Sequence, residues 1–568
     1  MAAGRTLLSP LSRRSLGGAA PALLALALVA CAPDGAGPGI DTDRALGHVA
    51  ALAAQPRPGD SDASRAAAAY LRAQVPGLVE LRVGSVVLPE ITVMGATYRR
   101  PHRVDTTDPD LVVRFGPATG KALLVMAHYD TVPASPGAVD NAAAVGALIE
   151  LARVLAVTPP ATPVLLAFTA NEEIGLVGAE ALVEQRGQEV ELAIALDLVG
   201  GSGALSLNGA SELIGTAEMR WLAAAADRAG VVVRAPLPHR MVSRWWPQAE
   251  RSDHGPFTRH GIRAFHLYDR GQDGEWIDLA YHSPRDRVGR VDRASVDALG
   301  RLLRALVAVP PPPHTSDGFW LPVVANTVVP RWLLLAVELA LAAIALVRLR
   351  RAVTRLAGAR VVAALVSIGV LVGATGLAVL VERLALGGAW IHAPLAPLLG
   401  LALVLAGAVG LLGTLARRLV ASELAGLYHV VAIGLPLLIG LALVALGAAE
   451  LAWIWLAPAA ATGLWLGVLQ LLPVALILAP AQLREAVWNG FWPTGVPLAV
   501  WIAVLGLPAI AAASAIARRR SLGPLGALVL PLGCGLAMIA GVIVVFSAVP
   551  TCANCEINQF DLTHEVDR

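Results

Sequence analysis

The feature that most constrains this 568-residue chain is a long C-terminal stretch in which no aspartate occurs between Asp317 and Asp561. Apolar runs of about 20 residues recur within it, which is the length that an α-helix needs to cross a bilayer. The whole chain is 56% hydrophobic but only 15% charged, against roughly 25% in an ordinary soluble protein. This composition excludes a disordered protein and argues against a wholly soluble one. A net charge of +2 gives no reason to expect nucleic acid as a partner.

Arginine clusters predict how the apolar runs cross the membrane. By the positive-inside rule, the clusters at residues 348–360, 417–418 and 518–520 face the cytoplasm. Alternation between them requires residues 451–480 to cross twice or to re-enter without crossing. We expect a transmembrane domain at 331–548 with about eight helices, followed by an extracytoplasmic tail at 549–568. Outside 451–480, the expected spans are 331–347, 361–381, 396–415, 425–447, 496–517 and 524–548.

The N-terminus resembles an export signal. Arg5, Arg13 and Arg14 precede a short run rich in Ala and Leu, so residues 1–31 predict either a cleaved signal peptide or an uncleaved signal anchor. The end of this run also resembles a bacterial lipoprotein box, which would place a lipid on Cys31. An export signal agrees with a middle domain on the extracytoplasmic side of the membrane.

The middle segment predicts one α/β domain at residues 40–308, joined to the first span by a Pro-rich linker at 309–330. Strands alternating with helical patterns indicate a mainly parallel, mixed sheet sandwiched by helices, here followed by an all-α membrane domain. Ligands of such sheets bind beyond the carboxyl ends of the strands. The expected strands are residues 123–127, 164–169, 192–196 and 262–267.

Histidine and carboxylate side chains follow these strands. His128 and Asp130 follow the first, Glu172 and Glu173 the second, and Asp197 the third. Carboxylates crowded at one edge raise one another's pKa, and a divalent cation between them removes the conflict. A mixture of His, Asp and Glu suits zinc. These residues therefore predict a metal site at this edge of the sheet.

Asp140 suggests that the site holds two metals. It opens a helical stretch at residues 142–156, where it can present both carboxylate oxygens without competing with its own backbone. Two metals in one site need a shared carboxylate and further ligands on each side. Because Glu172 and Glu173 point in different directions at a strand end, one can bind metal while the other holds a water.

Five motifs occur in order along the middle segment: His128-x-Asp130, Asp140-Asn141, Asn171-Glu172-Glu173, Asp197 and Tyr281-His282-Ser283. This ordered set resembles the motifs of the M28 metallopeptidases, the co-catalytic zinc aminopeptidase group, over about residues 65–305. The resemblance implies a zinc-exopeptidase-like fold and a first zinc ion held by His128, Asp140 and Asp197. It implies a second zinc ion held by Asp140, Glu173 and His282, with Asp140 bridging the two.

The resemblance also implies roles for the remaining residues. Glu172 would be the general base, and Asp130 would accept the second ring N–H of His128 and fix its tautomer. Residues 252–257 are similar to a Ser-Asp-His-x-x-Phe pattern of the family, in which Asp253 would contact substrate or simply belong to a loop packed on the sheet. Trp245 and Trp246 would form an apolar wall of the substrate pocket or cap the core.

These residues predict a membrane-anchored, extracytoplasmic zinc aminopeptidase that acts on a peptide or protein. A peptidase domain followed by many spans resembles the membrane-bound subgroup, similar to endoplasmic-reticulum and vacuolar membrane proteases. Two alternatives remain. One is a glutaminyl-cyclase-like enzyme with a single zinc, against which His128 and Asp197 argue together. The other is a non-catalytic receptor or scaffold that retains the peptidase fold.

Overall fold

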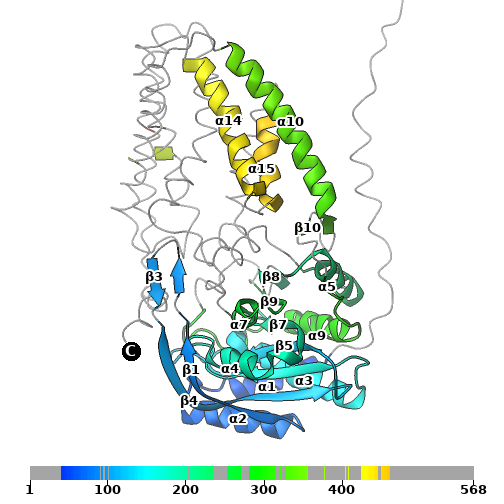
Figure 1. The fold of residues 1–568 in the computed structure, drawn as a ribbon. Helices are drawn as coiled ribbons and strands as arrows, with labels where there is room; N and C mark the ends of the chain where they lie inside the picture. The colour runs from blue at the N-terminus through cyan, green and yellow to red at the C-terminus, as the bar shows by residue number, and fades with distance from the viewer. Residues whose placement is uncertain are drawn as a thin grey trace, which may run out of the picture.

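The middle of the chain folds as the sequence predicts, into one sheet between two layers of helices (Figure 1). The protein is represented by a computed structural model. It describes residues 40–89, 91–93, 96–99, 101–201, 205–210, 213–233, 252–269, 280–314, 320–322, 328–355, 424–445 and 449–460, together with five isolated residues between 377 and 536.

Seven strands form the main sheet, in the order β1-β4-β6-β5-β7-β9-β8. Each residue of β5, β6 and β9 is buried, because helices cover both faces of the sheet, and this explains the apolar runs that fill β5 and β6 up to their last residues. The strands are β1 (Val79–Leu88), β4 (His102–Phe115), β5 (Ala122–His128), β6 (Val164–Thr169), β7 (Val190–Leu196), β8 (Leu205–Ala210) and β9 (Ala264–Asp269).

The sheet is mixed, but the expectation that it is mainly parallel needs correction. Strand pairs β5–β6, β5–β7 and β7–β9 are parallel, whereas β1–β4, β4–β6 and β8–β9 are antiparallel. Parallel pairing is thus confined to the centre. Strand β4, which lies second from one edge of the sheet, was not predicted. Its residues Thr106, Asp108 and Asp110 occupy alternate, buried positions and give it the polar pattern of a loop.

Helices on one face of the sheet share a large core with the strands. Their members are α1 (Thr42–Leu52), α2 (Asp62–Gln74), α3 (Ala143–Val157), α5 (Thr216–Ala229) and α9 (Arg293–Val307). The opposite face is covered by α4 (Val177–Arg186) and α7 (His254–Arg259). Helix α3 follows the expected helical stretch closely and is buried along nearly its whole length, so it holds the turn that precedes it firmly against the sheet.

The start of the expected linker packs onto the α/β domain. The indole N–H of Trp221 donates to the carbonyl of Val309 at 3.1 Å, and Arg263 Nη1 donates to the carbonyl of Pro312 at 2.8 Å. A short hairpin of β10 (Trp320–Pro322) and β11 (Val328–Pro330) then leads directly into α10 (Arg331–Arg355).

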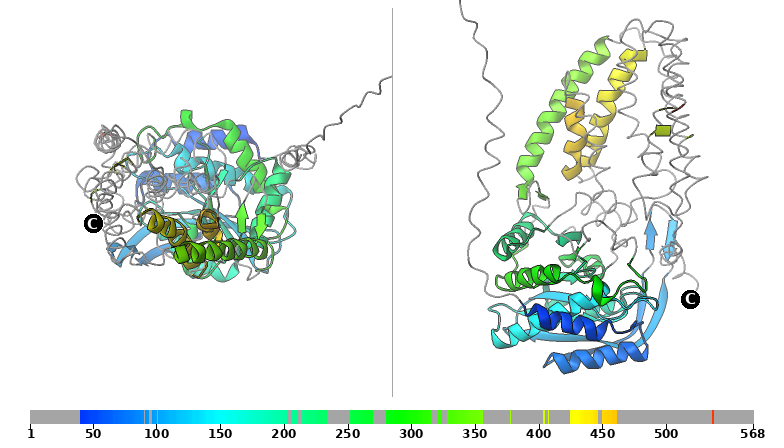
Figure 2. Two further views of the ribbon diagram at one scale, coloured as in Figure 1. Left: turned by 90° about the horizontal axis from the view of Figure 1, so that it is seen from above. Right: turned by 180° about the vertical axis from the view of Figure 1, so that it is seen from behind.

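Helices α10, α14 (Leu424–Ala445) and α15 (Ala449–Ala460) pack side by side at the end of the molecule opposite α2 (Figure 2). Among the described residues, one helix, Trp332–Thr354, is long and apolar enough to cross a membrane, and Ile433–Ala445 is a shorter apolar helix. Helix α10 ends at Arg355 instead of residue 347, so Arg348, Arg350, Arg351 and Arg355 of the first arginine cluster lie on its last turns.

Several predictions concern residues that lie outside the described part of the chain, apart from the five isolated residues mentioned above. They are the export signal at 1–31, the spans at 361–381, 396–415, 496–517 and 524–548, residues 461–480 of the segment 451–480, the tail at 549–568, and Trp245 and Trp246.

Candidate metal centre

The predicted ligands converge at the carboxyl ends of the central strands. His128 is the last residue of β5, and Asp197 directly follows β7. Glu173 lies on the loop after β6, and His282 lies on the loop between β9 and α9. Asp140 lies between β5 and α3, in a short helical turn, η1 (Ala138–Ala142), where its own φ and ψ are not helical.

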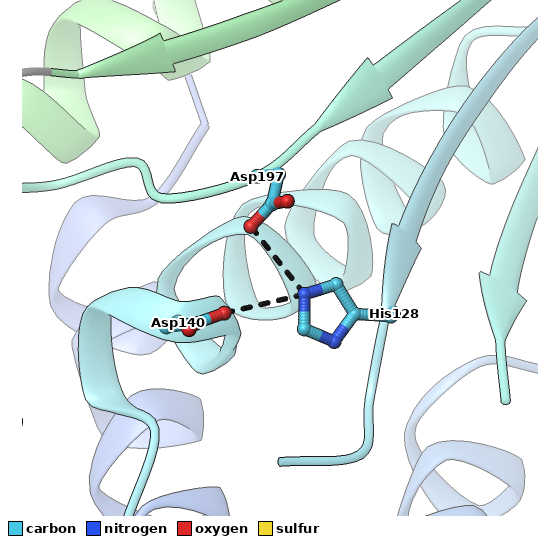
Figure 3. Close-up of side chains that lie close together, drawn as sticks. All are labelled: His128, Asp140 and Asp197. Carbon is cyan, nitrogen blue, oxygen red and sulfur yellow. Dashed lines mark hydrogen bonds and ion pairs between the residues drawn. The ribbon is translucent and has the colours of Figure 1, made fainter. Parts of the chain in front are cut away.

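A first group of ligand atoms surrounds the His128 ring. Its Nε2 atom lies 3.3 Å from Asp140 Oδ1 and 3.4 Å from Asp197 Oδ1, and both carboxylates point toward the same ring nitrogen (Figure 3). All three side chains are buried. One His and two carboxylates therefore face a common point.

A second group lies on the other side of Asp140. The Nε2 atom of His282 is 3.3 Å from Asp140 Oδ2 and 3.0 Å from Glu173 Oε2. The two oxygens of Asp140 thus contact different histidines. His128 and His282, which are 154 positions apart in the sequence (282 − 128), meet through this one carboxylate.

The spacing of these atoms fits a metal. Tetrahedral ligands at about 2.0–2.1 Å from zinc lie about 3.3 Å from one another, and the four contacts above span 3.0–3.4 Å. In each group the ligand atoms all lie within 4.8 Å of one another. Glu173 Oε1 is also buried without a hydrogen-bond partner among the described residues. Nitrogen and oxygen donors of this kind match the preferences of zinc.

Asp286 holds the turn that presents Asp140. Its Oδ1 atom accepts a hydrogen bond from the backbone N–H of Val139 at 2.8 Å, and its Oδ2 atom accepts one from the N–H of Asp140 at 3.0 Å. Gly137 begins this turn at φ 64°, and a Cβ there would lie 2.3 Å from the carbonyl oxygen of Asp140. Only glycine fits this position without displacing the backbone of the ligand.

Asp130 faces His128 and also organises the neighbouring loop, a role that the sequence did not predict. Its carboxylate accepts the backbone N–H groups of Glu172 and Glu173, each at 3.1 Å. The nearest oxygen of Asp130 to His128 Nδ1 is the backbone carbonyl, at 3.3 Å, while the carboxylate Oδ1 is 3.6 Å away. Asp130 therefore fixes the position of both glutamates, and its carbonyl is the closer partner of the ring.

Burial and mutual repulsion disturb the acid–base properties of these groups. Burial raises the pKa of Glu172 well above its ordinary value, and the positive charge of His128 only partly opposes this effect. Burial likewise raises the pKa of Glu173 to about 7, although His282 lowers it. For Asp140 burial alone would raise the pKa, but hydrogen bonds from His128 and His282 lower it overall. A divalent cation would relieve the repulsion among these carboxylates.

The chain matches the model of peptidase family M28 over residues 110–307. This chain carries a peptidase family M28 domain. The domain is homologous to aminopeptidase YwaD of Bacillus subtilis (strain 168), with 30% identity over 194 residues, which is 32% of this chain and 40% of that protein. It is also homologous to the vacuolar membrane protease of Candida albicans (strain WO-1), with 40% identity over 77 residues, which is 13% of this chain and 9% of that protein.

The matched residues span less than half the length of either relative. Among solved structures, a zinc aminopeptidase from Bacillus subtilis, BSAP, aligns with 16% identity and a TM-score of 0.38, covering 47% of this chain and 94% of that chain.

Asp253 of the M28 domain lies beside this centre but is fully buried at the start of α7. It accepts a hydrogen bond of 2.5 Å from the hydroxyl of Thr169, at the end of β6. Burial raises the pKa of Asp253 to about 6, against the opposing charge of His128. Its neighbour His254 is buried too, so both residues pack against the sheet.

Three residues support the ligands of the M28 domain in ways that the sequence did not predict, although Asn141 stands in one of the five motifs. Asp286 follows His282 by four positions, a spacing that nothing in the sequence marks as a contact with Asp140. Asn141 donates from Nδ2 to the carbonyl of Leu196 at 2.7 Å and so ties the Asp140 turn to the end of β7. Arg57, which lies between two prolines, gave no signal that its guanidinium is buried next to this centre.

Proposed function

We propose that this chain is a membrane-anchored metallopeptidase that uses two zinc ions to hydrolyse peptide bonds, most simply as an aminopeptidase. The observation that most supports this proposal is that Asp140 contacts His128 with one oxygen and His282 with the other, both at 3.3 Å. A carboxylate shared in this way divides the ligands into two sets of three, which a site for one ion does not require. The match to family M28 and the aminopeptidase name of the Bacillus relative support the reaction class.

We assign the ligands as follows. His128, Asp140 and Asp197 hold the first ion, and Asp140, Glu173 and His282 hold the second. Bound zinc would supply a Lewis acid for the scissile carbonyl and lower the pKa of an attacking water.

Glu172 is the group that moves the proton in this proposal. Its carboxylate is buried beside the ligands, and its backbone N–H is fixed by Asp130 Oδ1. Burial raises the pKa of Glu172 above its ordinary value, which makes its carboxylate a stronger proton acceptor. Glu172 takes a proton from the attacking water and delivers it to the amine that leaves.

The peptidase domain is proposed to occupy residues 40–308, outside the cytoplasm, ahead of a transmembrane domain of about eight helices at 331–548. Support comes from α10, whose 23-residue apolar stretch leaves large side chains such as Trp332, Leu339 and Leu346 exposed in the structure. Exposed apolar side chains over the length of a helix suit a lipid environment. The vacuolar membrane protease relatives agree with membrane association.

The decisive experiment compares the full-length protein, purified in detergent, with Glu172→Gln on a panel of fluorogenic aminoacyl substrates. We expect turnover that a chelator abolishes and zinc restores. Glu172→Gln should lose about 10²–10⁴-fold in kcat, since it keeps the side-chain shape but cannot accept the proton. Its zinc content, measured by elemental analysis, should equal that of the wild type.

Three results would reject the proposal. Equal turnover in Glu172→Gln would remove the general base. A zinc content of one ion per chain would favour a single-metal enzyme of the glutaminyl-cyclase kind. Zinc binding without any cleavage of the panel would favour a scaffold that retains the fold.

A further inference from the structure

We propose that Arg57 is a positioning residue of the metal centre, acting through the loops that carry the ligands. Arg57 lies between α1 and α2, ahead of the residues that match the family. The inference rests on the proposed function, because it concerns how strongly the same centre holds metal.

The Arg57 guanidinium joins three parts of the chain. Its Nε atom donates to the carbonyl of Tyr129 at 2.9 Å, directly after His128. Its Nη1 atom donates to the carbonyls of Pro136 at 2.8 Å and Leu52 at 2.6 Å, and Nη2 donates to that of Gly137 at 3.3 Å. One side chain, only 2% exposed, therefore fixes the turn after β5, the turn that leads to Asp140, and the end of α1.

The backbone of Arg57 strengthens this connection. Its N–H donates to Thr131 Oγ1 at 2.8 Å, and the N–H of Thr131 donates to the carbonyl of Arg57 at 3.1 Å. A reciprocal pair of this kind fixes the separation of the two segments. Thr131 lies one residue after Asp130, which positions both glutamates of the centre.

Gly59 extends the contact to the third loop of the centre. A Cβ at Gly59 would lie 1.8 Å from Asn171 Oδ1, so the two segments touch without room for a side chain. Asn171 directly precedes Glu172 and is fully buried at φ 58°. The segment at 57–60 thus contacts the loops that carry His128, Asp140 and Glu172.

The positive charge of Arg57 lies near carboxylates, but its hydrogen bonds go to backbone carbonyls. Within the described part of the chain, the hydrogen bonds of its guanidinium all go to backbone carbonyls, although Asp130, Asp286 and Asp140 lie close enough to influence its pKa. Burial lowers the pKa of Arg57 to about 10, and these carboxylates oppose that effect, so the group stays cationic at neutral pH. A fixed cation beside clustered carboxylates reduces their mutual repulsion.

Arg263 offers a matched control in the same domain. It is also buried, at 4% exposed, and it donates to carbonyls and to the carboxylates of Glu218 and Glu191 on the α5 side of the sheet. Removing either arginine should lower thermal stability. Only Arg57 contacts the ligand loops, so only its removal should change metal binding.

The test uses the full-length protein in detergent and compares Arg57→Met, Arg57→Lys and Arg263→Met. Zinc affinity is measured by competition with a chromophoric chelator, alongside kcat, KM and Tm. We expect Arg57→Met to weaken zinc binding about 10–100-fold, as is typical for groups that support metal ligands, and to lower kcat with little change in KM. Arg57→Lys keeps the charge and should recover part of the affinity. Arg263→Met should lower Tm with zinc affinity within about twofold of the wild type.

Unchanged zinc affinity in Arg57→Met, or an equal loss in Arg263→Met, would overturn the proposal. Should Arg57→Met fail to fold, Thr131→Val supplies the same test, because it removes the hydroxyl that accepts the Arg57 N–H. A retained zinc affinity in that variant counts against the proposal as well. Failure of the proposed function looks different: the wild type would bind zinc without cleaving any substrate, while the Arg57 variants would still bind it more weakly.

Discussion

The metal centre has a strand side, where His128 and Asp197 lie at the ends of neighbouring strands, and a loop side, where Glu173 and His282 lie on loops. The two sides are held in place by different kinds of contact. Strand β5 is bonded to β6 and β7 on its two sides, and β7 is bonded to β5 and β9. The backbone hydrogen bonds of the sheet therefore fix the positions of the ligands at the ends of these strands. The ligands on the loops are not part of the sheet, so their positions depend on buried polar contacts.

Those contacts come from groups that bind no metal in our assignment. Asp130 fixes the backbone of Glu173, Asp286 fixes that of Asp140, and Arg57 holds the turn before Asp140. Leu198 (φ 54°) and His282 (φ 53°) also adopt left-handed backbone conformations. Each such residue costs of order 1–3 kcal/mol and persists only where its surroundings enforce it. This cost falls on both sides of the centre, because Leu198 directly follows the strand-side ligand Asp197 and His282 is itself a ligand of the loop side.

The largest predicted effect separates the two sides directly. His282→Ala removes one ligand from the loop side only, so we expect the protein to lose one of its two zinc ions, keep the other, and lose nearly all turnover. Asp140→Ala removes the shared carboxylate and should release both ions. Elemental analysis of the purified variants measures the counts.

His260→Ala serves as the control for this comparison, because His260 is exposed at the end of α7 and its ring contacts the carbonyl of Pro256. It should keep both ions. Loss of both ions in His282→Ala would mean that the two sides are not separable.

The sequence predicted the strand side of the centre more completely than the loop side. Residues 123–127 and 192–196 are continuous apolar runs, so the ends of β5 and β7, and with them His128 and Asp197, could be located from hydropathy alone. On the loop side, Glu173 was located at the end of the second expected strand, whereas His282 was reached only through the resemblance to a family. The groups that hold those loops could not be predicted, since Arg57 and Asp286 act through backbone atoms that the fold brings to them.

The second prediction concerns Asp286→Asn. The Asp286 carboxylate accepts two backbone N–H groups, one on each oxygen, but an asparagine has only one acceptor oxygen. Its amide would face a second N–H group at Val139 or Asp140 and displace the turn. We expect zinc affinity to fall about 10–100-fold in the chelator competition assay.

A matched control lies six residues further along the chain. Asp292 caps α9 through Oδ2, which accepts the backbone N–H of Ser295 at 2.9 Å. Asparagine caps helices as well as aspartate does, so Asp292→Asn should leave zinc affinity unchanged. Equal affinities in both variants would show that the Asp140 turn does not need Asp286.

The smallest effect is on stability. Gly59→Ala would drive a methyl group into Asn171 Oδ1, and the buried amide cannot swing away, so we expect a loss of about 1–3 kcal/mol in the free energy of unfolding. Gly47→Ala lies within α1 with nothing near the added methyl, and should instead stabilise by up to about 1 kcal/mol. Thermal and denaturant unfolding report both values. A neutral Gly59→Ala would contradict the close contact between the segment at 57–60 and the Asn171 loop.

The central claim is that Asp140 lies between two metal ions, and diffraction at the zinc absorption edge from crystals of the zinc-loaded protein tests it most directly. We predict two anomalous peaks about 3.5–4 Å apart, one beside His128 and Asp197 and the other beside Glu173 and His282. A single peak, or two peaks that do not share Asp140, would contradict this account.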